Sequence, residues 1–450
     1  MRDLFFVAFL MILAAIGTKR PFVFVLAYVY IDNLAPQRLT YMLLNSVPIS
    51  LIFVGLAVLA WALVDDKKDS RFSPRQGLIL LLLVYCGATT TQADFPLEAA
   101  DKWSWVWKAL LFAAFLPLTL RTRLRFESLL LFMIASAASI IIIGGIKTLV
   151  SGGGYGSLNL MVTNNTGLYE SSIISMVAIA IIPLIMFLLN DSLIFPPSWK
   201  SKLIGYALIF ACLLMPIGTQ ARTGLICIVV VAIMALRTIK RRMLYLSIMA
   251  GLALVSIPLL PTSFTNRMDT IKGYKADQSA STRLAVWSWT WSYVKDHPFG
   301  GGFQAYLQNK IRYELTDAEE TGAQTEVENT LTVDHARAYH SSYFEMLGEQ
   351  GFPGLLIWLT IHLTGIVRME MLYRKYAKRP VDQDRWIGRL ASALQQGHII
   401  YMIGSLFVGV AFQPFVYMLV GMQIGLDSYA KRRSSEARWK PIARSLPAQA

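Results

Sequence analysis

At residues 337–354 the chain reads Arg337-Ala-Tyr-His340-Ser341-Ser-Tyr-Phe-Glu345-Met-Leu-Gly348-Glu-Gln-Gly351-Phe-Pro-Gly354. A long polar segment ends in this stretch, and an apolar run follows it. Residues 341–350 are expected to be helical. Gly351 permits a sharp turn after them, and Pro353 suits the first turn of the next helix. His340 is therefore predicted to lie where the polar segment meets a helix that enters the membrane.

Composition indicates a membrane protein. The 450 residues are 55% hydrophobic and 16% charged, which is far less charge than a soluble protein of this size carries. Apolar runs recur from end to end, and we predict an all-α polytopic membrane protein of roughly 12 transmembrane helices, each spanning a ~30 Å hydrocarbon core. The net charge of +14 lies in short loops and the tail, as in loops that face anionic lipid, so it does not indicate nucleic-acid binding.

The expected spans follow the apolar runs of the chain. The first two are short and are separated by Lys19 and Arg20. The expected ranges are 4–17, 21–33, 46–64, 77–93, 103–120, 128–149, 171–189, 203–217, 223–236, 243–260, 351–371, 390–411 and 415–427. These ranges divide the chain into N-terminal helices (1–260), a large periplasmic loop (261–350), C-terminal helices (351–427) and a basic cytoplasmic tail (428–450).

Lysine and arginine clusters set the predicted orientation, because cytoplasmic loops carry an excess of both. From residue 65 onwards the clusters fall in alternate loops, and the intervening loops near 94–102, 150–170, 218–223, 261–350 and 411–414 are expected to face outside. Residue 1 also lies outside if both early runs span. Within the long external loop, the aromatic run 284–294 predicts a helix along the membrane interface. Residues 314–334 carry acidic and no basic side chains, which favours a mobile solvated flap.

Histidine 340 is the candidate catalytic residue. His362 and His398 lie within apolar spans, where packing is the ordinary role of a histidine. His340 instead stands just before a helix at the external face. A neutral imidazole there is able to take a proton from an attacking hydroxyl near pH 7.

Three arginines are candidates for binding a phosphate. Arg222 lies between two apolar spans at the external face, where it either reaches to the interface or grips a lipid-linked phosphate bidentately. Arg283 begins the interfacial aromatic helix, whose start also favours an anion. Arg337 precedes His340 by three residues and is a weaker candidate. Lys102 and Lys147, near external helix ends, are interpreted as lipid-headgroup anchors.

Acidic residues give weaker signals. Glu345 is a weak candidate for binding or orienting the acceptor, although it is too far round a helix from His340 to hold the imidazole directly. Glu170 either orients an acceptor sugar or a histidine, or caps the helix that follows it. The pair Asp382 and Asp384 falls on the cytoplasmic side and is interpreted as a salt-bridge cluster. The three cysteines, which are Cys86, Cys212 and Cys227, are expected to be buried small hydrophobes. No metal or cofactor is expected.

The chain resembles the O-antigen ligase and polymerase superfamily. The resemblance is carried by a histidine and a small polar residue (His340-Ser341), nine further residues and then GxxG (Gly351 to Gly354). Arg222 and Arg283 fit the two arginines that such ligases use on undecaprenyl diphosphate. The N-terminal third, with Arg20-Pro21 and Pro36-Gln-Arg38-Leu, is similar to exosortase-associated O-glycosylation ligases.

The resemblance implies a GT-C-like architecture in the bacterial inner membrane with its active site facing the periplasm. It implies metal-independent, inverting transfer of a glycan from undecaprenyl diphosphate, with His340 activating the acceptor hydroxyl and Arg222 and Arg283 stabilising the diphosphate. The acceptor is lipid A core, a protein hydroxyl or another lipid-linked glycan, so a ligase and a polysaccharide polymerase both remain open. A lipid-linked glycan transporter is the third reading. It is disfavoured because the spans are nearly free of ionisable residues at their centres.

Overall fold

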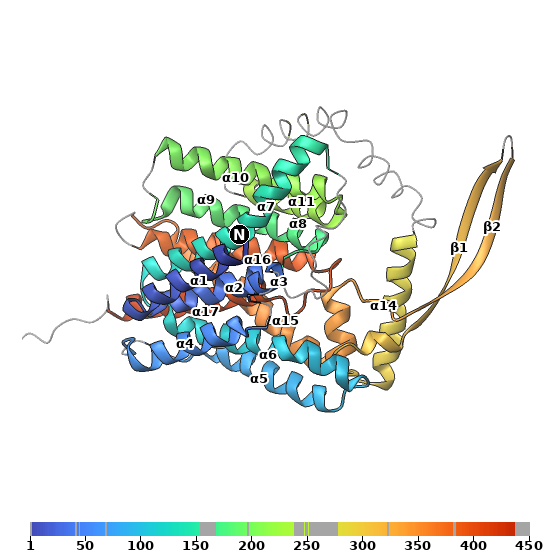
Figure 1. Cartoon of the computed structure of the whole chain (residues 1–450), viewed down its shortest axis with the longest axis horizontal. Coiled ribbons are helices and arrows are strands. Elements are labelled where there is room, and N and C mark those ends of the chain that lie inside the picture. Colours follow the sequence, from blue (N-terminus) through green and yellow to red (C-terminus); the bar gives the residue numbers. More distant parts are fainter. Residues whose placement is uncertain are drawn as a thin grey trace, which may run out of the picture.

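The core of the structure is a bundle of helices around α15 (Ser342–Tyr376), the longest described helix at 35 residues. The computed structural model describes residues 2–40, 43–44, 46–67, 70–153, 168–195, 198–237, 247, 251, 278–321, 324–380 and 384–436. Helix α15 packs against α5 (Pro74–Thr91), α16 (Arg385–Gly404) and α17 (Pro414–Glu436). Most helices lie side by side, and α14 (Gln278–Asp296) stands across one end of the bundle (Figure 1).

The remaining helices surround this core, and all of them except the short helix Pro36–Leu39 overlap a predicted apolar run. They are α1 (Arg2–Lys19), α2 (Phe22–Leu34), α3 (Pro36–Leu39), α4 (Ile49–Leu63), α6 (Pro96–Thr119), α7 (Arg123–Ser151), α8 (Ser171–Ala180), α9 (Ile182–Asp191), α10 (Trp199–Gly218) and α11 (Arg222–Leu236). The predicted span 243–260 lies almost wholly outside the described residues. Every other predicted run overlaps a helix.

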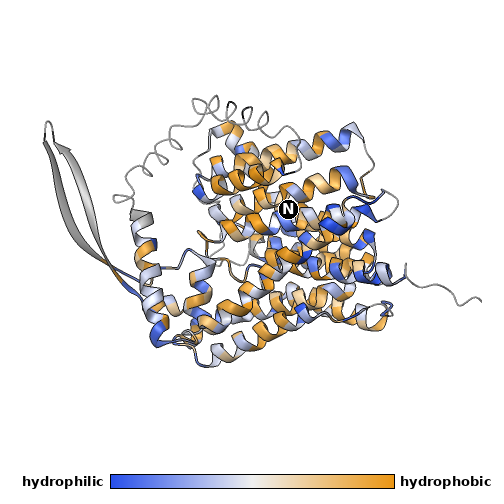
Figure 2. Ribbon diagram, turned by 180° about the vertical axis from the view of Figure 1, so that it is seen from behind, coloured by the Kyte–Doolittle hydropathy of each residue, from blue (hydrophilic) through white to orange (hydrophobic). Residues whose placement is uncertain are grey.

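Large apolar side chains lie on the outside of the bundle as well as inside it. Leu63 on α4, Val84 on α5, Ile204 on α10 and Leu356 on α15 are each more than two-thirds exposed. Apolar residues dominate the helices, and hydrophilic ones gather towards their ends (Figure 2). Within the described residues, four helical segments are long and apolar enough to cross a membrane: Arg123–Ser151, Ser171–Asp191, Trp199–Gly218 and Ser342–Tyr376. An apolar outer surface of this extent is typical of a helical membrane protein.

Polar residues fix where several helices begin. Ser73 and Gln76 form a reciprocal capping box at the start of α5, and Pro74 occupies its first turn. The side chains of Thr122 and Ser198 are simple N-caps of α7 and α10, and they accept from the amides of Arg125 and Ser201. Helix α6 begins at Pro96, earlier than the predicted 103, so its first two turns carry charged residues. Helix α17 continues past the predicted 427 to Glu436, where Lys431 pairs with Asp427 at 3.0 Å, one helical turn away.

The segment predicted to be an acidic flap is a β-hairpin, and the expectation of a purely α-helical chain is wrong there. Strands β1 (Lys310–Thr321) and β2 (Gln324–His335) pair antiparallel, with Lys310 opposite His335 and Thr321 opposite Gln324. The hairpin extends away from the bundle beyond α14 (Figure 1). Threonine and valine recur in this sequence, and their preference for strands outweighs the acidic composition on which the flap prediction rested.

Helix α15 is broken at Gly351, and a glycine-containing loop packs against the break. Gly351 has φ 64° and ψ −168° and breaks the helix there. The loop at 298–302 docks onto this break: the amide of Phe352 donates to the carbonyl of Pro298 at 3.0 Å, and the amide of Gly301 donates to the carbonyl of Gly348 at 3.1 Å. A Cβ at residue 351 would lie 2.2 Å from the Pro298 carbonyl oxygen, so only glycine fits. The kink fixes residues 342–350 as a separate short helix directly after His340.

Candidate functional site

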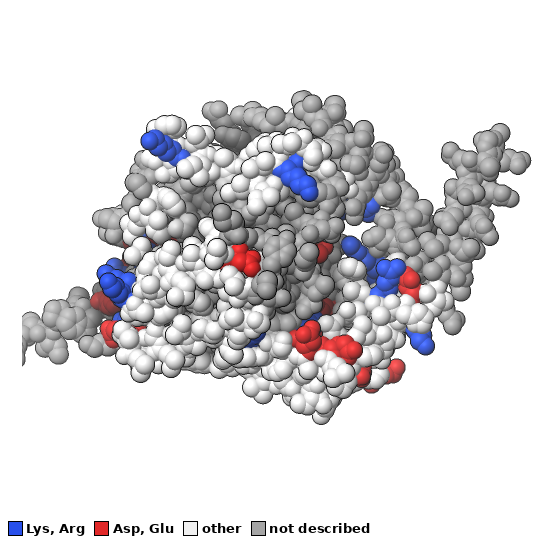
Figure 3. Space-filling view, in the orientation of Figure 1, with Lys and Arg blue, Asp and Glu red and all other residues white. Residues whose placement is uncertain are grey.

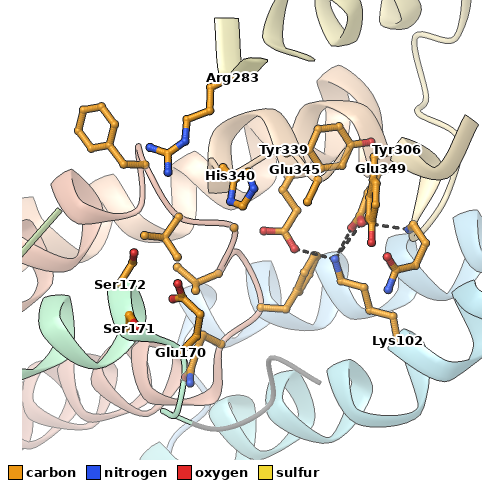
Figure 4. Close-up of a pocket in the computed structure, with 18 of the residues that line it drawn as sticks. Lys102, Glu170, Ser171, Ser172, Arg283, Tyr306, Tyr339, His340, Glu345 and Glu349 are labelled. Carbon is orange, nitrogen blue, oxygen red and sulfur yellow. Dashed lines mark hydrogen bonds and ion pairs between the residues drawn. The ribbon is translucent and has the colours of Figure 1, made fainter. Parts of the chain in front are cut away.

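A cavity of about 770 Å³ opens where α14 meets the helical bundle. Its walls come from the first turns of α6 and α8, the residues preceding α11, the start of α14, the beginning of α15, and the loop 407–413 between α16 and α17. His340 and Arg283 lie on one side of it, and Glu170 lies across from them (Figure 4). The structure therefore brings four of the six predicted site residues to one cavity: His340, Arg283, Glu170 and Glu345.

His340 faces this cavity from a left-handed backbone conformation, with φ 48°. Protein atoms surround most of the imidazole, and the part that remains exposed faces the cavity. This partial burial, together with the positive charges of Arg283 and Arg337, lowers the pKa of the imidazole from its ordinary 6.5. The ring is therefore neutral at pH 7, the protonation state that a general base requires.

Backbone strain gathers around the cavity. Six described residues other than glycine have positive φ, and three of them, Gln220, Gln304 and His340, line this cavity. Such conformations are unfavourable for side chains with a Cβ, and they cluster at binding and catalytic sites. The strain supports a functional role for this cavity over a gap left by packing.

A buried charge cluster forms the far wall and corrects the interpretation of Lys102 as a headgroup anchor. The Lys102 Nζ donates to Glu345 Oε1 at 2.6 Å and to Glu349 Oε2 at 2.7 Å. Lys102 is only 7% exposed and Glu349 is fully buried. Because α6 begins before its apolar run, Lys102 lies inside the helix on the face that packs inward. Glu345 and Glu349, one turn apart on α15, face it as a pair.

Glu345 also holds the loop between α16 and α17. Its Oε2 accepts a hydrogen bond from the amide of Ala411 at 3.0 Å. The Ser342 Oγ accepts one from the amide of Val410 at 2.9 Å. Glu349 accepts from the amide of Gln304 at 3.0 Å. The Lys102 cluster thus connects α6, α15 and two loops of the cavity wall. Sequence reasoning missed it, although the i, i+4 spacing of two glutamates at an external helix start was a usable signal.

Glu170 is the N-cap of α8. Its Oε2 accepts from the amide of Ile173 at 2.8 Å. The sequence left open whether Glu170 orients a substrate or caps the helix, and the structure shows the capping hydrogen bond. The residue also lines the cavity, beside Ser171 and Ser172 at the open end of the helix (Figure 4).

The other two arginines do not line the cavity. Arg222 is the first residue of α11, directly after the lining residues 219–221. Arg337 is exposed, and its Nε donates to Asp334 Oδ2 at 2.8 Å. The structure therefore brings Arg283 to His340, places Arg222 one residue beyond the wall, and gives Arg337 a carboxylate of β2 as its partner.

A second polar cluster lies inside the bundle. His362 Nδ1 and His398 Nε2 are 2.8 Å apart, and His398 Nδ1 lies 3.0 Å from Gln423 Nε2. All three side chains are fully buried, which confirms the packing role predicted for these histidines. Arg75, predicted to lie in a cytoplasmic loop, is also buried beside them at Gly365. This cluster adds a buried arginine to the two histidines that the sequence places within the spans.

Other predictions about reactive side chains are settled in part. Cys86, Cys212 and Cys227 are free and buried, as expected. Asp384 pairs with Arg433 at 3.3 Å, in agreement with the predicted salt-bridge cluster, and Asp382 lies outside the described residues. Within the part of the chain that the structure describes, no group of three or more histidine, cysteine or acidic side chains is arranged to hold a metal ion.

The apolar helices and this polar cavity define a helical membrane protein with one site built around a histidine and an arginine. Residues 207–359 match the family model described as O-antigen ligase. This match contains both His340 and Arg283, and it supports the resemblance to the O-antigen ligase superfamily that the histidine motif predicts. Residues 1–193 match a model described as a family of unknown function (DUF5935). No curated protein matches the chain.

Proposed function

We propose that this protein transfers a glycan from undecaprenyl diphosphate to an acceptor hydroxyl on the periplasmic face of the bacterial inner membrane. The family match supports a glycosyltransferase-like enzyme. The observation that carries the proposal is that His340 and Arg283 line the same cavity. A base for the acceptor and a cation for the departing diphosphate are the two groups such a transfer requires.

The donor diphosphate binds at the Arg283 end of the cavity. Residues 219–221 before α11 line the cavity. The start of α11 carries partial positive charge and favours an anion, whereas the start of α8 already holds the Glu170 carboxylate. Arg222, at the first position of α11, is placed to reach the same anion once it is bound. A planar guanidinium matches phosphate oxygens in pairs and stabilises the charge that grows as the bond breaks.

His340 removes the proton of the acceptor hydroxyl. The acceptor oxygen attacks the anomeric carbon of the donor from the face opposite the diphosphate and forms the new glycosidic bond. The bond between that carbon and the diphosphate oxygen breaks, and the electron pair leaves with undecaprenyl diphosphate. The hydroxyl proton ends on the His340 imidazole, and the anomeric configuration is inverted.

Reconstitution tests this proposal. Purified protein in lipid is mixed with an undecaprenyl-diphosphate-linked oligosaccharide and an acceptor, and the products are identified by mass spectrometry. The proposal predicts one glycosidic bond per released undecaprenyl diphosphate, with undiminished activity in excess chelator. Transfer of a single preassembled chain identifies a ligase, whereas a ladder of repeats on the lipid carrier identifies a polymerase. Movement of intact lipid-linked glycan across the bilayer without any new bond would contradict the proposal.

A further inference from the structure

One face of α6 presents acidic and aromatic side chains to the cavity. Glu98, Asp101 and Trp105 follow one another at helical spacing. Asp101 and Trp105 line the main cavity, while Glu98 and Asp101 line a second cavity of about 380 Å³. The two cavities share Asp101, Gln304 and Tyr306 and are therefore adjacent. Acidic side chains gather around the end of the bundle where α6 begins (Figure 3).

The carboxylates of this face are available to a ligand. Glu98 and Asp101 are both exposed, and neither has an ion pair or hydrogen bond with another described residue. Lys102, the nearest cation on the same helix, is held between Glu345 and Glu349 and does not neutralise them. This side of the cavity thus has four carboxylates against one ammonium group, whereas Arg283 lies on the other side (Figure 4).

Aromatic groups complete this half of the cavity. Tyr306 lines both cavities, and its ring packs edge-on against Tyr339 at a centroid distance of 5.6 Å. Tyr339 lines the cavity and is only 3% exposed, and its hydroxyl has no hydrogen-bond partner among the described residues. This hydroxyl lies against Gly348 and is closed off from the cavity, so Tyr339 supports the Tyr306 ring and does not itself reach a ligand. Backbone strain at Gln304 fixes the same wall.

We propose that this part of the cavity, defined by Glu98, Asp101, Trp105 and Tyr306, binds the acceptor as a neutral sugar and disfavours a phosphorylated one. The assignment rests on the transfer reaction proposed above. Carboxylates accept hydrogen bonds from sugar hydroxyls, and aromatic rings pack on the apolar face of a pyranose. A phosphate placed here meets several negative charges at short range, and charge repulsion of this kind discriminates between ligands.

Acceptor competition tests the assignment. A neutral oligohexose glycolipid and the same glycolipid carrying one phosphate monoester are offered with one donor. We expect the neutral acceptor to be preferred by at least about tenfold in kcat/KM. Asp101→Asn with Glu98→Gln is expected to raise KM for the neutral acceptor and to reduce this preference, with little change in kcat. Asp296→Asn, an exposed acid at the end of α14, serves as the matched control and is expected to keep the preference.

Binding without turnover separates this inference from the proposed reaction. In the His340→Ala protein, saturation-transfer NMR measures contact of each glycolipid with the protein. Selective binding of the neutral glycolipid that depends on Asp101 supports the assignment. If the wild-type protein binds this glycolipid in the same way but transfers nothing, the proposed transfer reaction is contradicted and the binding assignment stands. Equal or stronger binding of the phosphorylated glycolipid overturns the assignment, as does failure of both to bind.

Discussion

Two histidine regions, one just before α15 and one within it, differ in what surrounds them. His340 stands just before α15, faces a cavity and has Arg283 beside it. His362, within α15, is sealed in the bundle and hydrogen-bonded to His398. Both regions place a histidine among polar groups in a membrane protein. Only the first leaves the imidazole accessible to a substrate, and access to a substrate distinguishes a candidate base from a buried polar contact.

Removing the accessible histidine is expected to have the largest effect. His340→Ala should lower transfer by about 10²- to 10⁴-fold, because that is the usual contribution of a general base. Its unfolding temperature in detergent should change little, because the His340 side chain faces the cavity and alanine keeps the same left-handed backbone conformation. His335→Ala, an exposed histidine of β2, is the control. Wild-type turnover in the His340 variant would remove the base assignment.

The buried Lys102 cluster should dominate stability. Lys102→Met leaves Glu345 and Glu349 without their cation, and breaking a buried ion pair costs about 3–5 kcal/mol. Glu349→Gln should be milder, because Lys102 keeps Glu345. Chemical or thermal unfolding in detergent measures both, with Lys295→Met at the exposed end of α14 as control. Equal stability of the wild type and Lys102→Met would show that the cluster does not hold the cavity wall together.

The sealed histidine pair should affect stability and leave the chemistry intact. His398→Ala removes partners from His362 and Gln423, and leaving buried polar groups unpaired costs about 1–3 kcal/mol. Transfer per folded molecule should stay within about twofold of wild type. Folded protein is quantified by size-exclusion chromatography before the assay. A folded but inactive His398→Ala protein would erase the distinction between the two histidine regions.

The smallest expected effect is on pH dependence. Burial and then Arg283 and Arg337 lower the pKa of His340 below 6.5, so the unprotonated base persists to lower pH than for an ordinary histidine. Activity should fall as the pH drops through this lowered pKa. Arg283→Gln should move the acid limb of the residual activity to higher pH, and Arg337→Gln should move it less. If the acid limb of the pH–activity profile lies at the same pH in both variants as in the wild type, these charges do not act on the titrating group.

The sequence predicted most of the described helices, the turn at Gly351 and the presence of His340 and Arg283 in one site. Apolar periodicity and glycine geometry are local properties, and they predict local structure well. The partners of Lys102 were not predicted, because α6 and α15 are far apart in the chain and only folding brings Glu345 and Glu349 to it. The hairpin was missed because acidic composition was weighed above the strand preference of its threonines and valines.

The candidate site shows the same division. A motif of short span located His340, whereas the assignment of Arg222 and Arg337 relied on their closeness to the external face. Closeness to the membrane surface does not fix the direction of a side chain. Arg337 turns to Asp334 on the neighbouring strand, and Arg222 begins a helix one residue beyond the cavity wall. Which arginine lies near the histidine depends on how the helices and the hairpin pack together in the folded protein.

The central claim is that His340 moves the acceptor proton while Arg283 holds the donor in the same cavity. Its most direct test is single-turnover transfer from a prebound undecaprenyl-diphosphate-linked glycan, measured together with the Kd of that donor, in wild type, His340→Ala and Arg283→Gln. The account predicts that His340→Ala binds the donor within about threefold of wild type but fails to transfer it, whereas Arg283→Gln binds it at least about tenfold more weakly. Transfer at the wild-type rate from the donor bound to His340→Ala would contradict the account.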